Sequence, residues 1–181
     1  MKEEIRKEFS LLEDDWLTLS FNDGEWKTIL ASAEEYINKN INKKLATTML
    51  TEIKAVLYTL VHDGNAYEDV VIETALLYLL TKKAILSFEN LEEVYPDFIT
   101  KAVAILLDYK NPEYLNNIFN SEDYPYLNKI KLSELIVKLK NLDKEKDLEK
   151  QKEKTSEAKT IVKKYDGLTH KGLMESLKSL I

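Results

Sequence analysis

The sequence predicts an all-α protein, and its turn residues, its hydrophobic pattern and its overall composition lead to that prediction. The chain of 181 residues contains only four glycines and three prolines. Strand-rich proteins need many more turn residues, so this scarcity favours long helices joined by short loops. A hydrophobic content of 44% beside 32% charged residues is typical of globular chains. The length favours a single domain that spans residues 1–181.

Apolar residues recur at helical spacing from the start of the chain. The lead-in, residues 1–24, carries Ile5, Phe9 and Leu12 at intervals of four and three, which predicts an amphipathic helix. A second helix should follow at once, with Asn22 as its N-terminal cap. The apolar side of that second helix consists of Trp26, Ile29, Leu30, Ala33 and Ile37.

The segment 68–83 is predicted to be the central helix of the protein. A helix over about 42–62 precedes it, with apolar residues on one face. The segment 68–83 is instead apolar on all sides, so we expect a compact helical bundle that encloses it. Its apolar run, 70–80, is interrupted by Glu73 and is too short to cross a bilayer, so no membrane partner is expected.

Further helix starts follow at regular intervals. Ser87 is placed to cap a short helix, and Pro96 to start the next one. The pair Asn111-Pro112 repeats that pattern of a cap followed by proline. A long helix is then predicted over 126–142.

The C-terminal part divides into a charged and an apolar segment. Glutamates and lysines recur every four residues in 143–160, which predicts an exposed helix. Its charges suit either a solvated face or an interaction surface for a protein partner. Segment 161–181 returns to helical periodicity at Leu173, Leu177 and Leu180, so we expect it to pack back on the core.

The composition also excludes several classes of function. The absence of cysteine excludes disulfides, thiolate zinc sites and cysteine nucleophiles. A net charge of −6 offers no global footprint for DNA or RNA. No glycine-rich phosphate loop is present. No charged-then-apolar leader opens the chain, so the cytoplasm is the expected location.

The chain has two histidines, and one of them stands in the dipeptide His62-Asp63. A His-Asp dipeptide supplies two metal ligands in HD-type phosphohydrolases, and a site needs about four such groups from different helices. The other interpretation is a helix C-terminus, with His62 near the negative end of the dipole and Gly64 as a left-handed cap. We favour the cap. His170 stands at a predicted helix start, where a surface or capping role is expected.

Three stretches together resemble a known family. They are Glu68–Pro96 (EDVVIETALLYLLTKKAILSFENLEEVYP), Lys129–Leu142 (KIKLSELIVKLKNL) and the last forty residues, which contain EAKTIVKKYDGL. From about Ile29 to Ile181 the chain resembles the hydrolase domain of RelA/SpoT-type proteins and the small alarmone hydrolases. The resemblance implies an all-helical HD fold. In that family a manganese ion serves to remove pyrophosphate from guanosine tetra- and pentaphosphate.

The family's metal ligands are mostly replaced in this sequence. Its His-Asp pair falls on Tyr78-Leu79, and its upstream histidine falls on Thr51 or Glu52. The aspartate of its KLAD motif falls on Glu134. One or two carboxylates cannot hold a divalent ion that catalysis leaves partly open. The resemblance therefore implies a vestigial pocket without a metal.

The family's catalytic Glu-Asp pair falls on Lys82 and Lys83, which reverses the charge. Two ammonium groups beside such a pocket are candidate phosphate contacts. The alternative is that both lysines end the central helix, where cations suit the helix dipole. Both interpretations stay open at this point.

Three functions follow from these patterns. The first is an inactive or strongly divergent HD-type domain that binds a nucleotide, such as a guanosine polyphosphate, or a protein. The second is an active divergent phosphohydrolase, with Mn²⁺ held by His62, Asp63 and Glu134. The third is a helical interaction module with a vestigial pocket. Whether the chain is an enzyme stays open, and the lost ligands favour that it is not.

Overall fold

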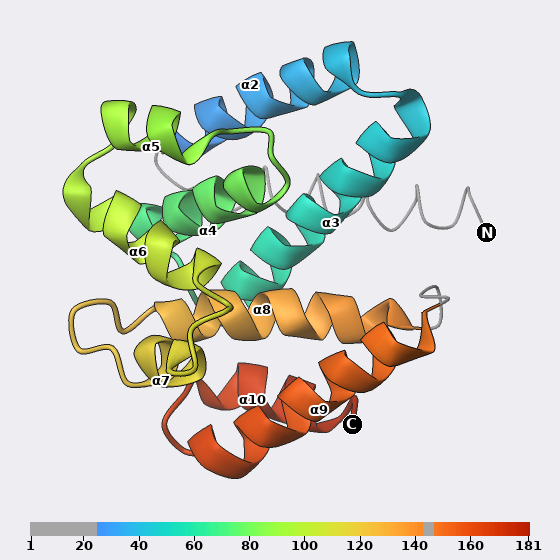
Figure 1. Ribbon diagram of the computed structural model, residues 1–181, viewed down its shortest axis with the longest axis vertical. Coiled ribbons are helices and arrows are strands. Elements are labelled where there is room, and N and C mark those ends of the chain that lie inside the picture. The colour runs from blue at the N-terminus through green and yellow to red at the C-terminus, as the bar shows by residue number, and fades with distance from the viewer. Residues whose placement is uncertain (1–24, 143–146) are drawn as a thin grey trace.

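The computed structural model describes residues 25–142 and 147–181, and every regular element within those ranges is a helix (Figure 1). The prediction of an all-α protein is confirmed. No helix in the described ranges is long and apolar enough to cross a membrane. The helix and the cap predicted within residues 1–24 lie outside the described residues. The helices are α2 (Glu25–Asn40), α3 (Lys43–His62), α4 (Asp69–Lys82), α5 (Phe88–Val94), α6 (Asp97–Leu107), α7 (Tyr114–Phe119), α8 (Leu127–Lys140), α9 (Leu148–Tyr165) and α10 (Lys171–Lys178).

Short polar side chains start several helices, as the sequence predicts for Ser87. Its hydroxyl accepts the N–H of the third residue of α5 at 3.1 Å. The Asn42 side chain does the same for α3 at 3.0 Å. The Asn111 side chain instead accepts the N–H of Glu113 at 2.9 Å, and α7 begins one residue later. Pro96 is the cap of α6, one position before the first helical turn.

Two helices, α4 and α8, form the interior of the protein. α4 is buried on all sides, as expected for 68–83, and α8 is enclosed in the same way. In Figure 1, α8 crosses the middle of the molecule, with α3, α4 and α6 on one side and α9 and α10 on the other. The fully enclosed apolar side chains of these two helices include Ile72, Leu76, Leu77, Ile130, Leu132 and Ile136.

The charged helix α9 ends later than the sequence indicated. It continues past the expected end at 160, because Ala158, Ile161 and Tyr165 form a buried stripe that keeps it against its neighbours. The turn after it contains Gly167 at φ 88°, a conformation that glycine adopts without strain. α10 then packs back on the core through Leu173, Leu177 and Met174, in agreement with the expectation for the C-terminal segment.

The junction of α3 and α10 corrects the predicted role of Gly64. The left-handed residue after α3 is Asn65, at φ 46°, and Gly64 is not among the positive-φ residues of the described chain. A Cβ at Gly64 would collide with the carbonyl oxygen of Leu60 and lie 3.1 Å from Cδ1 of Leu173. Gly64 is therefore needed for its close contact with the end of α3, and to a lesser degree with α10, and not for its backbone angle.

We predict that Gly64→Ala lowers the free energy of unfolding by about 1–3 kcal/mol, because the added methyl group overpacks the junction. Asn65→Gly should change it by less than about 1 kcal/mol, since glycine adopts the left-handed conformation freely. Urea denaturation of both variants checks this. A neutral Gly64→Ala would contradict the close contact at Gly64.

Candidate functional site

A buried tyrosine and a buried glutamate join the two interior helices. Tyr78 lies on α4 with no exposed surface, and Glu134 on α8 is 1% exposed. The Tyr78 hydroxyl donates to Oε2 of Glu134 at 2.9 Å. An ionised carboxylate is rarely enclosed without compensating charge, so its remaining partners decide whether this arrangement is stable.

Two lysines supply that compensation. Lys82 follows Tyr78 by one turn of α4, and its Nζ lies 2.6 Å from Oε1 of Glu134. The same ammonium group donates to the Tyr78 hydroxyl at 2.7 Å. Lys138 follows Glu134 by one turn of α8 and lies 2.8 Å from the same Oε1. We call these four residues the Glu134 cluster.

Burial and neighbouring charges shift the pKa values of Glu134, Tyr78 and Lys82. Burial opposes ionisation of Glu134, but the ammonium groups of Lys138, Lys82 and Lys131 outweigh it and hold the pKa of the carboxyl well below its ordinary value. Burial raises the pKa of Tyr78 far above 10.0, and the neighbouring Glu134 adds to the rise. Burial also lowers the pKa of Lys82 to about 8, although Glu134 partly offsets this. The tyrosine therefore stays protonated and donates.

A second buried ion pair lies next to the Glu134 cluster and joins α8 to α9. Lys131, 5% exposed, lies on α8 one turn before Glu134, and its Nζ lies 2.7 Å from Oε1 of Glu157 on α9. The ammonium group also lies 5.2 Å from the centre of the Tyr114 ring. The Tyr114 hydroxyl donates to the carbonyl of Leu106 at 3.0 Å. Sequence reasoning missed Lys131 and Lys138, although both stand within four residues of Glu134 in a helix that is buried along its length.

Of the other predicted pocket positions, two form an ion pair and two carry no charge. Lys83 on the end of α4 pairs with Glu52 on α3, with 2.5 Å between Nζ and Oε2. Thr51, the alternative to Glu52, is partly exposed on α3. Leu79 is 1% exposed and belongs to the apolar core. Lys83 and Glu52 thus form an ion pair of their own, and neither they nor Thr51 and Leu79 belong to the Glu134 cluster.

The dipeptide His62-Asp63 lies at the C-terminal end of α3, away from Glu52. Ten residues of helix place His62 about 15 Å from Glu52 along the axis. The His62 ring lies against the Tyr58 ring, with 4.1 Å between centroids, and Asp63 is the C-cap of α3. His62 therefore ends its helix as predicted, and it faces a packing partner there.

Manganese does not fit the donors that the fold assembles. Within residues 25–142 and 147–181, no three His, Asp or Glu side chains lie together as a metal site requires. The Glu134 carboxylate already accepts from two ammonium groups and a hydroxyl. His170, the cap of α10, has its Nε2 3.4 Å from the side-chain nitrogen of Asn65. The set of His62, Asp63 and Glu134 therefore offers no shared centre.

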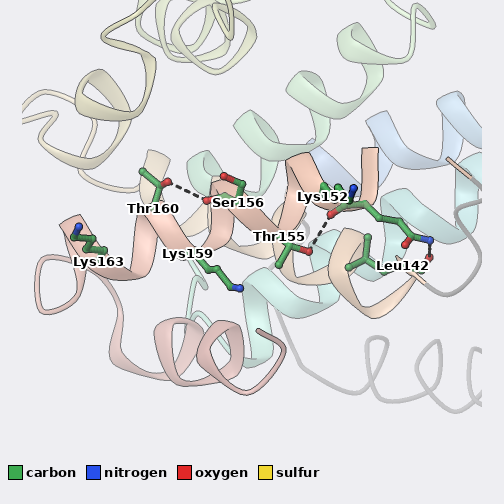
Figure 2. Close-up of a pocket in the computed structure, with 8 residues that line it drawn as sticks. Leu142, Lys152, Thr155, Ser156, Lys159, Thr160 and Lys163 are labelled. Carbon is green, nitrogen blue, oxygen red and sulfur yellow. Dashed lines mark hydrogen bonds between the residues drawn. The ribbon is translucent and has the colours of Figure 1, made fainter. Parts of the chain in front are cut away.

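A groove of about 520 Å³ runs along the outer side of α9 (Figure 2). Its lining combines basic and hydroxyl side chains from one helix with the end of the segment after α8. The residues are Leu142, Gln151, Lys152, Thr155, Ser156, Lys159, Thr160 and Lys163. The sequence had marked this segment as charged and exposed, but periodicity alone did not indicate a groove.

Comparison with known proteins returns no match, whether with protein-family models, curated proteins or solved structures. The resemblance to alarmone hydrolases therefore remains a prediction, and the geometry carries the functional argument.

We predict that Glu134→Gln lowers the free energy of unfolding by about 2–4 kcal/mol. Removing one partner of a fully buried pair costs about 3–5 kcal/mol. The cost is smaller here because Lys82 and Lys138, 35% and 26% exposed, can turn toward water. Glu175→Gln, in an exposed i,i+4 pair with Lys171, is the matched control and should cost less than about 1 kcal/mol. Equal losses in both variants, measured by denaturation at neutral pH, would contradict the structural role.

The same carboxylate should make stability depend on acid. Its pKa in the folded state lies below the ordinary 4.5, so its contribution is complete above pH 4.5 and is lost as the pH falls. We expect the free energy of unfolding of the native chain to drop more steeply below pH 4.5 than that of Glu134→Gln. Urea denaturation in a series of buffers measures both slopes, and parallel curves would contradict this assignment.

Proposed function

We propose that this chain is a divergent HD-like helical domain that acts by binding and not by metal-dependent hydrolysis. One observation carries the proposal: the Glu134 cluster occupies positions that the resemblance assigns to metal ligands and to the catalytic pair. Of its members, Tyr78 falls on the histidine of the His-Asp pair, Glu134 on the aspartate of the KLAD motif, and Lys82 on the glutamate of the catalytic pair. All three contact one another directly.

The chemistry of this cluster opposes hydrolysis. A divalent ion would have to displace two ammonium groups from Glu134. The neutral Tyr78 hydroxyl is a poor ligand, because its pKa lies far above neutral pH. A hydrolytic metal also needs an open position for water, and Tyr78 and Glu134 are enclosed.

Nucleotide binding at Lys82 and Lys83 is the second candidate, and one observation favours it. Two ammonium groups, of Lys82 and Lys138, face the single carboxylate of Glu134, which leaves one positive charge in excess. The Lys82 side chain is 35% exposed and accessible to an anion. A phosphate there would share ammonium groups that already donate to carboxylates, so the binding would be weak and sensitive to salt.

A protein partner remains the third possibility, through the charged outer side of α9. The expected cytoplasmic location belongs to the same proposal.

We expect the purified chain to release neither pyrophosphate nor phosphate from a panel of nucleotides that includes guanosine polyphosphates, with or without added Mn²⁺. Added Mn²⁺ should also leave the melting temperature unchanged. Product release followed by chromatography and thermal denaturation measure the two effects. Turnover that requires Mn²⁺ and disappears in Glu134→Gln would show that the chain is an active hydrolase.

The second candidate predicts a thermal shift with guanosine polyphosphates that Lys82→Ala/Lys83→Ala abolishes. Lys101→Ala/Lys171→Ala, at exposed lysines in i,i+4 pairs, is the matched control. A shift that survives in the first variant would exclude Lys82 and Lys83 as the phosphate contacts.

A further inference from the structure

The lysines of the α9 groove form a single stripe. Lys152, Lys159 and Lys163 stand seven and four residues apart. At about 100° per residue they lie within about 40° of one another around the helix, and they span about 16 Å along it. All three are exposed. Figure 2 shows them distributed along the same helix beside the hydroxyl residues.

This stripe carries uncompensated charge. None of the three lysines contacts a carboxylate in the described part of the chain. Glu157, whose side chain faces α8, lies about 140° around the helix from Lys152. Its Oε1 is paired with Nζ of Lys131 at 2.7 Å. The stripe is therefore a positive surface on a chain whose net charge is −6.

Hydroxyl groups fill the space between the lysines. Thr155 and Thr160 each donate to a carbonyl one turn back, both at 2.9 Å. These two bonds orient the threonine oxygens, and Ser156 lies exposed between them. The rim is held in place by Gln151, whose side chain donates to the carbonyl of Leu142 at 3.2 Å.

We propose that the α9 groove binds a small ligand that carries two or more phosphate groups. Three ammonium groups spread over about 16 Å match several anionic groups better than a single one. A volume of about 520 Å³ falls within the range of about 300–1,000 Å³ that is usual for small-molecule sites. Lysine ammonium and serine hydroxyl groups both donate to phosphate oxygens. This inference rests on the proposed binding function and gives it a place and a ligand class.

The groove is distinct from the Glu134 cluster. Glu157 and Lys131 form their buried ion pair between α9 and α8, and the lysine stripe lies on the opposite flank of α9. Substitution of the three lysines therefore leaves the buried ion pairs of Glu134 and Lys131 intact. An acidic protein segment would also meet positive charge here, but the groove volume of about 520 Å³ favours a small ligand.

The test is calorimetric titration of the full chain with inorganic tripolyphosphate. Lys152→Glu/Lys159→Glu should weaken binding by about tenfold or more, since several ammonium–phosphate contacts are lost and repulsion is added. The matched control is Lys150→Glu/Lys164→Glu, which makes the same change of charge at exposed positions of α9 outside the groove. It should retain affinity within about threefold. Melting curves verify that both variants are folded.

Three results would overturn the inference. Equal losses of affinity in both double variants would show that only the overall charge of α9 matters. A loss confined to Lys82→Ala/Lys83→Ala would place the ligand at the Glu134 cluster, and the proposed binding function would stand. Binding of an acidic peptide to the groove without binding of tripolyphosphate would identify a protein partner instead. Turnover that depends on Mn²⁺ is the separate result that would remove the proposed function itself.

Discussion

The buried carboxylate of Glu134 is the constraint on which the arrangement of the interior helices depends. An ionised group without partners would be very costly at this depth, so α8 is stable only where Tyr78 and Lys82 of α4 can reach it. Lys131 imposes the same condition toward α9 through Glu157. Because charged pairs are directional, they specify which neighbours α8 accepts, whereas apolar burial alone does so less strictly. The two ion pairs thus orient α4 and α9 on opposite sides of one helix.

This constraint also shapes what the protein can do. The polar groups that would otherwise bind a metal or substrate are engaged with one another, so the interior of the domain is closed. Free positive charge remains on the outside, where Lys152, Lys159 and Lys163 line the groove of α9. We therefore propose that ligand binding takes place on the outer surface of α9, whose inner side is held against α8 by the pair of Glu157 and Lys131. The inner contact is a buried ion pair, and the outer stripe is where we propose that a ligand binds.

Much of the local structure was predictable because its causes are local. The caps at Ser87 and the enclosed character of 68–83 depend on residues within one or two turns of each other. Gly64 shows the limit, because its close approach involves Leu173, more than a hundred residues away. The resemblance placed Tyr78, Lys82 and Glu134 at one site, and these residues are in contact. It did not indicate Lys138, although the i,i+4 spacing from Glu134 was a local signal for that pair. It did not indicate the pair of Lys131 and Glu157 either, because those residues meet only when α8 and α9 pack.

The sequence by itself determined the all-α class, the absence of cysteine chemistry and an enclosed central helix, because composition and hydrophobic period act along the chain. Only the tertiary structure decided that α8 is a second interior helix and that its charges are neutralised from α4 and α9. It also decided which side of α9 is a groove. The physical reason is that Lys82 and Glu157 reach the charges of α8 from distant segments, a contact that no spacing within α8 encodes; only the pair of Glu134 with Lys138 is local.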